Sequence, residues 1–74
     1  MEVGKTYAIT LLCSFGQVME RCYVYELTET GTIKFATRLA NDIVFVEMIT
    51  SMLSAAETNP DEELEAAVTR AYRA

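Results

Sequence analysis

The chain has 74 residues, 51% of them hydrophobic, and its eleven acidic and six basic residues give a formal net charge of −5. This apolar fraction excludes disorder, because the chain has enough apolar surface to offset the entropy lost on folding. The acidic balance argues against direct binding of nucleic acid or of an anionic membrane, since both need clustered lysine and arginine. The length predicts a single small domain over residues 1–74.

Two features of the sequence predict a cytoplasmic location. The chain has no run of 18 apolar residues that could span a bilayer. Its first residues, Met1 to Lys5, lack the basic segment and apolar core of a signal peptide. The two cysteines are in keeping with a reducing compartment, where they act as small hydrophobic residues.

Residues 5–40 alternate with a period of two, which is typical of strands. Gly16 and Gly31 each follow two residues that suit a hairpin turn, and glycine enters the left-handed region at no steric cost. The pattern therefore predicts an antiparallel meander with two three-residue hairpin loops. Its strands are expected at about Thr6–Cys13, Gln17–Leu27 and Thr32–Leu39.

The predicted loops fix the register of this meander. Cys13 would face Gln17, and Thr28 would face Thr32, so that paired positions share the same parity. Most large apolar residues then fall on the odd-numbered face, and Glu26 falls opposite Lys34 as a pair of opposite charges.

The segment Asp42–Glu57 is the longest apolar stretch and predicts a long helix, capped by Asn41 or Asp42 and packed across the odd face. Pro60 ends this run and predicts a second, shorter helix with Asn59 as its cap. The apolar stripe expected on the second helix consists of Leu64, Ala67, Val68, Ala71 and Tyr72. The predicted fold class is therefore α+β, in the order β-β-β-α-α.

The sequence offers no candidate catalytic residue, metal ligand or cofactor site. There is no histidine, and no Cys-x-x-Cys, phosphate-binding glycine loop or Gly-x-Ser-x-Gly motif. We therefore expect a protein that is not an enzyme and that carries no cofactor or metal.

The even-numbered face predicts an interaction surface, because neither expected helix would cover its apolar side chains. The alternative is that these are the scattered apolar residues normal on a small sheet. Arg21 falls on the odd face, either as an interface anchor or with its stem covering the sheet margin. The interface candidates are Leu12, Val18, Cys22, Val24, Ala36, Lys34, Arg38 and Arg21.

Acidic residues gather around the start of the second predicted helix. They suit a solvated helix N-terminus, and they also admit an acidic mimic of DNA. The acidic surface candidates are Glu57, Asp61, Glu62, Glu63 and Glu65.

These patterns predict a non-enzymatic protein-binding module that forms a homodimer, since so small a core gains stability from association. Small acidic domains of this kind are a frequent form of phage or mobile-element inhibitors, which block a host or defence protein in the host cytoplasm. An alternative is an oligomer that sequesters a small ligand or nucleotide, with Lys34, Arg38 or Arg21 holding the anion. A DNA mimic is the second alternative.

Overall fold

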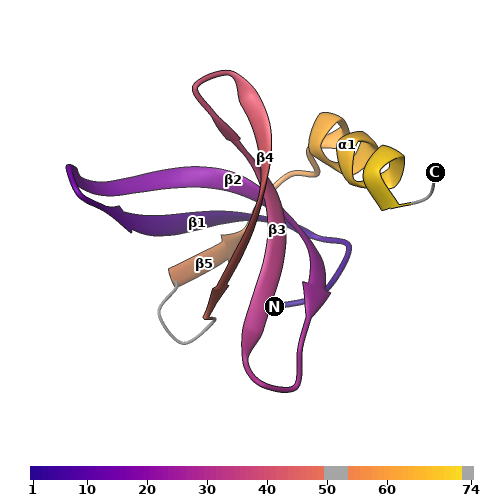
Figure 1. The fold of residues 1–74 in the computed structure, drawn as a ribbon, viewed down its shortest axis with the longest axis horizontal. Helices are drawn as coiled ribbons and strands as arrows, with labels where there is room; N and C mark the ends of the chain where they lie inside the picture. Colours follow the sequence, from indigo (N-terminus) through magenta and orange to yellow (C-terminus); the bar gives the residue numbers. More distant parts are fainter. Residues whose placement is uncertain (50–53, 73–74) are drawn as a thin grey trace.

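The computed structural model describes residues 1–49 and 54–72, and for residues 11–13 it describes the backbone alone. The strands form one antiparallel sheet in the order β4-β3-β2-β1-β5, and a single short helix follows them (Figure 1). The elements are β1 (Thr6–Cys13), β2 (Gly16–Leu27), β3 (Thr32–Leu39), β4 (Asp42–Ile49), β5 (Ser54–Glu57) and α1 (Glu62–Tyr72). The predicted meander of three strands is present, but the predicted β-β-β-α-α fold is wrong.

The segment Asp42–Glu57 forms strands β4 and β5 and not a long helix, with residues 50–53 outside the described part. Its first half explains why. Ile43, Val44 and Val46 are branched at Cβ, so they lose side-chain freedom in a helix and fit the pleated surface of a sheet. A wide apolar arc on a helix and a strand with apolar residues on both sides give similar sequence patterns.

The turn between β3 and β4 replaces the predicted helix cap. Ala40 and Asn41 have φ angles of 51° and 72°, and Leu39 pairs directly with Asp42. Two central residues with positive φ make the two-residue hairpin whose twist matches that of the strands. Asn41 thus turns the chain into another strand and does not begin a helix.

The predicted register of the first hairpin is wrong by one residue. Cys13 pairs with Gly16 and not with Gln17, because the loop has two residues, Ser14 and Phe15. Such a slip moves every side chain of β2 to the other face of the sheet, so that Cys22 lies beside Tyr7.

The second hairpin has the predicted register near its loop. Glu26 pairs with Lys34 as expected, and their side chains form an ion pair of 3.3 Å. A register shift between Val24 and Glu26 then places Val24 opposite Phe35. This bulge reverses the parity of pairing for the rest of β2.

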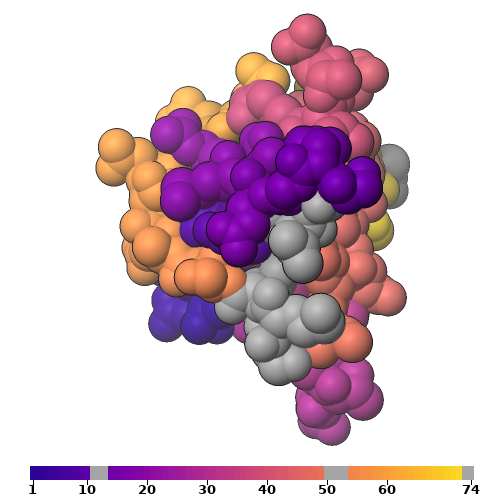
Figure 2. Space-filling view, turned by 90° about the vertical axis from the view of Figure 1, so that its left-hand side faces the viewer, coloured from indigo at the N-terminus to yellow at the C-terminus, as the bar shows by residue number. Residues whose placement is uncertain are grey.

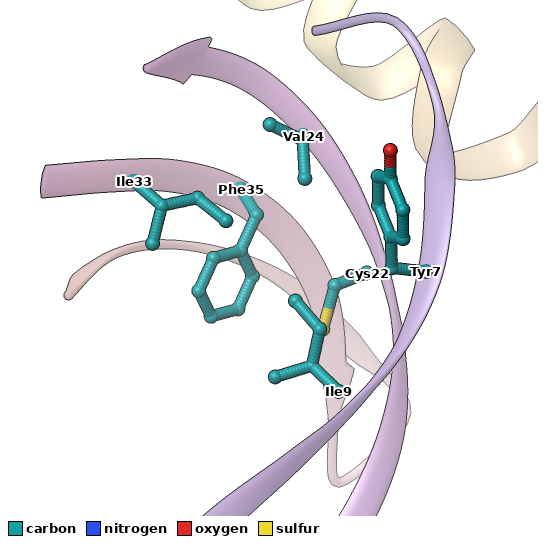
Figure 3. Packing of buried hydrophobic residues seen from close by; sticks show 6 residues of the cluster. All are labelled: Tyr7, Ile9, Cys22, Val24, Ile33 and Phe35. Carbon is teal, nitrogen blue, oxygen red and sulfur yellow. The ribbon is translucent and has the colours of Figure 1, made fainter. Parts of the chain in front are cut away.

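One face of the sheet carries the main core (Figure 3). Val46 and Met48 of β4 pack against it. The other face is covered by α1, so the burial of this core comes from curling of the sheet around it. The six core side chains are Tyr7, Ile9, Cys22, Val24, Ile33 and Phe35.

The connection between β4 and β5 requires this curl. The two strands run in the same direction at opposite edges, and only residues 50–53 separate them. Four strand spacings of a flat sheet measure about 19 Å. The chain from residue 49 to residue 54 reaches at most about 18 Å, and it must also return along the strand direction. The edges therefore approach one another.

The predicted C-terminal helix is present, but it begins at Glu62 and its cap is Asp61. The N–H of Leu64 donates to Oδ1 of Asp61 at 3.1 Å. Leu64 and Val68 pack against Ala36 of β3, on the face opposite the main core. The helix thus docks on the sheet and not on another helix.

Candidate binding surface

Three predicted interface residues are buried within the single chain. Cys22 and Val24 are in the main core, and Ala36 lies under the helix. The exposed apolar even face was therefore a wrong prediction. The one-residue slip in the first hairpin moved Cys22 and Val24 to the core, and α1 docks over Ala36. Burial raises the pKa of the Cys22 thiol to about 11, in keeping with a side chain that packs as a small hydrophobic group.

Two other interface candidates, Leu12 and Val18, lie in the outer half of the β1–β2 hairpin. The backbone of Leu12 pairs with Gln17, and its side chain is outside the described part of the structure. Val18 is half-buried. Within the described residues, β3 pairs with β2 from Tyr23 onward, so the outer half of the hairpin projects beyond its neighbours (Figure 1).

The described side chains in the outer half of this hairpin include two large apolar ones that are exposed. Phe15 is 78% exposed and Met19 is 69% exposed. No charged residue occurs between Lys5 and Glu20. Figure 2 looks onto the end of the hairpin, whose purple residues stand at the front of the molecule.

The predicted cations of β3, Lys34 and Arg38, lie on the face that carries the helix. The ammonium of Lys34 is 3.3 Å from Glu26 and 3.7 Å from Glu47, and the hydrogen bond to Glu26 is the main cause that raises the pKa of Lys34. Arg38 is paired with Asp61 and Glu63. Each cation is thus already held by two carboxylates, which weakens the alternative that they bind a nucleotide.

Asp61 is the most constrained of the acidic candidates. It is buried, and both of its carboxylate oxygens accept from the Arg38 guanidinium, at 2.6 and 3.0 Å. This pairing is the main cause that lowers the pKa of Asp61 to about 2, and it raises the pKa of Arg38. A paired and buried carboxylate serves the fold and is not available to a partner.

The other acidic candidates are exposed, although Glu63 shares Arg38 with Asp61. Glu57 lies on β5 and pairs with Lys5 at 3.6 Å. Glu62, Glu63 and Glu65 are exposed on the first turn of α1. Arg21, the remaining interface candidate, is exposed and adds to the positive field that lowers the pKa of Asp61.

An aromatic cluster, missed from the sequence, joins β2, β4 and the end of α1. The ring centroids of Tyr25 and Tyr72 are 5.0 Å apart. Phe45 meets both rings edge to face, with centroids at 6.1 Å from Tyr25 and 6.0 Å from Tyr72. The hydroxyl oxygens of Tyr25 and Tyr72 are 3.2 Å apart. Burial is the main cause that raises the pKa of Tyr25, and the hydrogen bond to Tyr72 is the second cause. We refer to these three residues as the aromatic cluster.

The aromatic cluster borders the free edge of β4. Along its other edge β4 pairs with β3 over all eight of its residues, from Asp42 to Ile49. No described strand pairs with the free edge. The sequence signal for this edge was the run Ile43 to Val46, which the helix prediction concealed.

The described residues contain no group of three or more potential metal ligands placed to hold an ion. They also enclose no pocket. Among the same residues no helix has the length and apolarity needed to cross a membrane.

Comparison of the chain with protein-family models, with curated proteins and with solved structures gave no match. The chain's own surface is therefore the guide to its function, and on this surface the β4 edge and the aromatic cluster lie together.

Proposed function

We propose that this protein is a non-enzymatic protein-binding module that accepts an extended segment of a partner along the free edge of β4. The observation that carries the proposal is that no described strand pairs with this edge. Sheets normally blunt a free edge with lysine, proline, a bulge or a very short strand. β4 has eight residues, contains neither lysine nor proline, and pairs with β3 in an unbroken register.

The chemistry of an added strand suits this edge. A strand at the edge of a sheet presents unpaired backbone N–H and C=O groups, which an extended peptide satisfies by hydrogen bonding. Side chains on alternate positions then provide the specificity. On β4 those positions carry Val44, Val46 and Met48 on one side of the sheet, and Ile43 and Phe45 on the other.

A selection experiment tests the proposal. The protein is immobilised and challenged with a display library of random nine-residue peptides, and the best binder is then synthesised with N-methyl groups on its odd or on its even residues. In an antiparallel ladder only every second residue of the added strand exchanges hydrogen bonds with the edge. We therefore expect one methylated form to lose binding and the other to keep it.

The position of the peptide is read from amide hydrogen exchange. Alternate amides of β4 should become protected when the peptide binds, because they acquire hydrogen-bond partners. The short edge strand β5, with four residues, is the internal control. Retention of no peptide, or protection on β5 in place of β4, contradicts the proposal.

A second candidate is self-association, and the projecting β1–β2 hairpin favours it. An isolated two-stranded hairpin is marginally stable in water, yet the outer half of this one carries exposed Phe15 and Met19 and no charged residue. A second copy that covered it would bury these side chains. The homodimer would then form through the hairpin and not through Cys22 and Val24.

The proposed location is a cytoplasm. Cys22 is a free, buried thiol, and free thiols persist in reducing compartments. Inhibition of a host or defence protein, as in phage and mobile-element inhibitors, is one role that a module of this kind could perform by occupying a partner's strand.

A further inference from the structure

We infer that the segment accepted at the β4 edge is a basic one, in which lysine or arginine side chains alternate with apolar residues. This inference rests on the proposed function and adds the chemistry of the partner. It follows from the charges and rings on the face of the sheet that carries α1.

The face of the sheet that carries α1 has a negative net charge. Lys34 is paired with Glu26 and Glu47, and Arg38 is paired with Asp61 and Glu63. Two cations against four carboxylates leave this network with a net charge of −2, and Arg21, whose charge acts on Asp61, brings the sum to −1. The chain as a whole has a net charge of −5. A partner with positive charge is thus attracted to the face that borders the β4 edge.

The aromatic cluster offers exposed rings beside the β4 edge. Phe45 is 44% exposed and Tyr72 is 63% exposed, although they lie among other rings. Phe45 and Glu47 occupy successive positions on the same side of β4, because side chains on a strand alternate. A strand added at the edge places its own side chains about 4.5–5.5 Å from these two. A lysine or arginine there contacts an aromatic ring and a carboxylate together.

The side chains on the other side of β4 indicate which residue type the added strand carries at its alternate positions. Val46 and Met48 pack against the main core, and Val44 is half-buried beside them. Apolar side chains on the added strand extend this surface. The partner segment is therefore expected to alternate between basic and apolar residues.

The same charges disfavour a second copy as the occupant. A copy would present its own β4, which carries Asp42 and Glu47 and no cation. Pairing of two such edges supplies nothing positive to the aromatic cluster or to Glu47. A basic segment of another protein fits the edge better.

The test uses the peptides selected by the random nine-residue library. We expect enrichment of lysine and arginine at alternate positions. Replacement of the arginine nearest the aromatic cluster by norleucine should weaken binding about tenfold, because it removes the cation and keeps an apolar stem. Binding should also weaken as the salt concentration rises from about 0.15 M to about 0.5 M, since salt screens exposed charges.

Protein variants locate the interaction. Phe45→Leu and Tyr72→Leu should each weaken the arginine peptide and leave the norleucine peptide nearly unchanged. Phe15→Leu, the same change at an exposed aromatic residue on the distant hairpin, should have no effect on either peptide. Thermal unfolding of each variant establishes that it is folded.

Two results would overturn the inference while the proposed function stands. These are selected peptides without basic enrichment, and equal affinity of the arginine and norleucine peptides. Two other results overturn both the proposed function and the inference: a wild-type protein whose β4 amides are already protected by a second copy, and the retention of no peptide at all.

Discussion

Asp61 connects three parts of the molecule through one side chain and one amide. Its Oδ1 caps α1 by accepting from Leu64, and its two oxygens bind Arg38 of β3. Its backbone N–H donates to the hydroxyl of Thr6 on β1 at 3.2 Å. Loss of this residue would therefore affect helix formation and docking together.

The Asp61 carboxyl makes stability depend on pH. Its pKa is lowered from 3.8 to about 2, so the ionised form stabilises the folded state above about pH 4, and this contribution is lost as the pH falls toward about 2. We expect Asp61→Asn, which keeps an N-cap, to lower the free energy of unfolding by about 1–2 kcal/mol at pH 7, after allowance for solvent around Arg38. Urea unfolding at several pH values measures the difference.

The difference between wild type and Asp61→Asn should shrink as the pH falls and be mostly lost near pH 2, because about half of the folded-state carboxyl is then protonated. Glu65→Gln changes an exposed acidic residue on the same helix and serves as the control. A difference that stayed constant from pH 7 to pH 2 would show that the Asp61 charge contributes nothing.

At the scale of the element, α1 depends on one large contact with the sheet. Leu64 is fully buried against Ala36, and the rest of the buried stripe consists of Ala67 and Val68, which are smaller. A helix of eleven residues is marginal in isolation. Its stability therefore comes from docking.

Leu64→Ala should lower the free energy of unfolding by about 2–4 kcal/mol, because it removes buried methyl groups and leaves a cavity. Ala66→Ser, at an exposed position two residues further on, should change it by less than about 0.5 kcal/mol. Circular dichroism in urea gives both values. A cost below about 1 kcal/mol for Leu64→Ala would mean that the helix is held mainly by the Asp61 contacts and the aromatic cluster.

The elements differ in how far the sequence could predict them. Alternation and turn residues sufficed for β1, β2 and β3, and a proline followed by acidic residues sufficed for the presence of α1. They failed for β4, because a strand with apolar residues on both sides lacks the alternation that marks a half-buried strand. The signal that was present is the β-branched run Ile43, Val44 and Val46.

Register was harder to predict than strand position. A glycine after a turn is compatible with a two-residue or a three-residue loop, so Gly16 could not distinguish Cys13 opposite Gly16 from Cys13 opposite Gln17. The bulge beside Tyr25 has no local sequence signal. The candidate surface was predicted from the face on which each residue should lie, so these two errors placed core residues such as Val24 on the predicted surface. For the same reason the aromatic cluster was not predicted.

At the scale of the whole molecule, the size of the chain favours association, because a domain of this length has a small core. If the hairpin joins two copies, Phe15→Lys combined with Met19→Lys should halve the solution mass measured by light scattering and leave the fold intact, since both side chains are exposed. Val24→Glu should instead unfold the protein, because it places a charge in the core.

The solution mass shows whether the hairpin or another part of the surface joins the two copies. A wild-type monomer, or a dimer whose mass the double substitution does not change, would exclude the hairpin as the joint between copies. A dimer that dissociates would leave the β4 edge of each subunit available to a partner.

The strand order also determines when each part of the sheet can form. Among themselves, β1 to β4 pair only with their neighbours in sequence, so these contacts close short loops and can form as soon as each strand has been made. β5 pairs with β1 across more than forty residues, Ser54 with Thr10 and Glu57 with Tyr7. The outer edge of β1 therefore stays open until the C-terminal residues arrive. During synthesis the meander of β1 to β4 therefore has two free edges. β5 pairs with one of them, the outer edge of β1, only after residues 54–57 have been made.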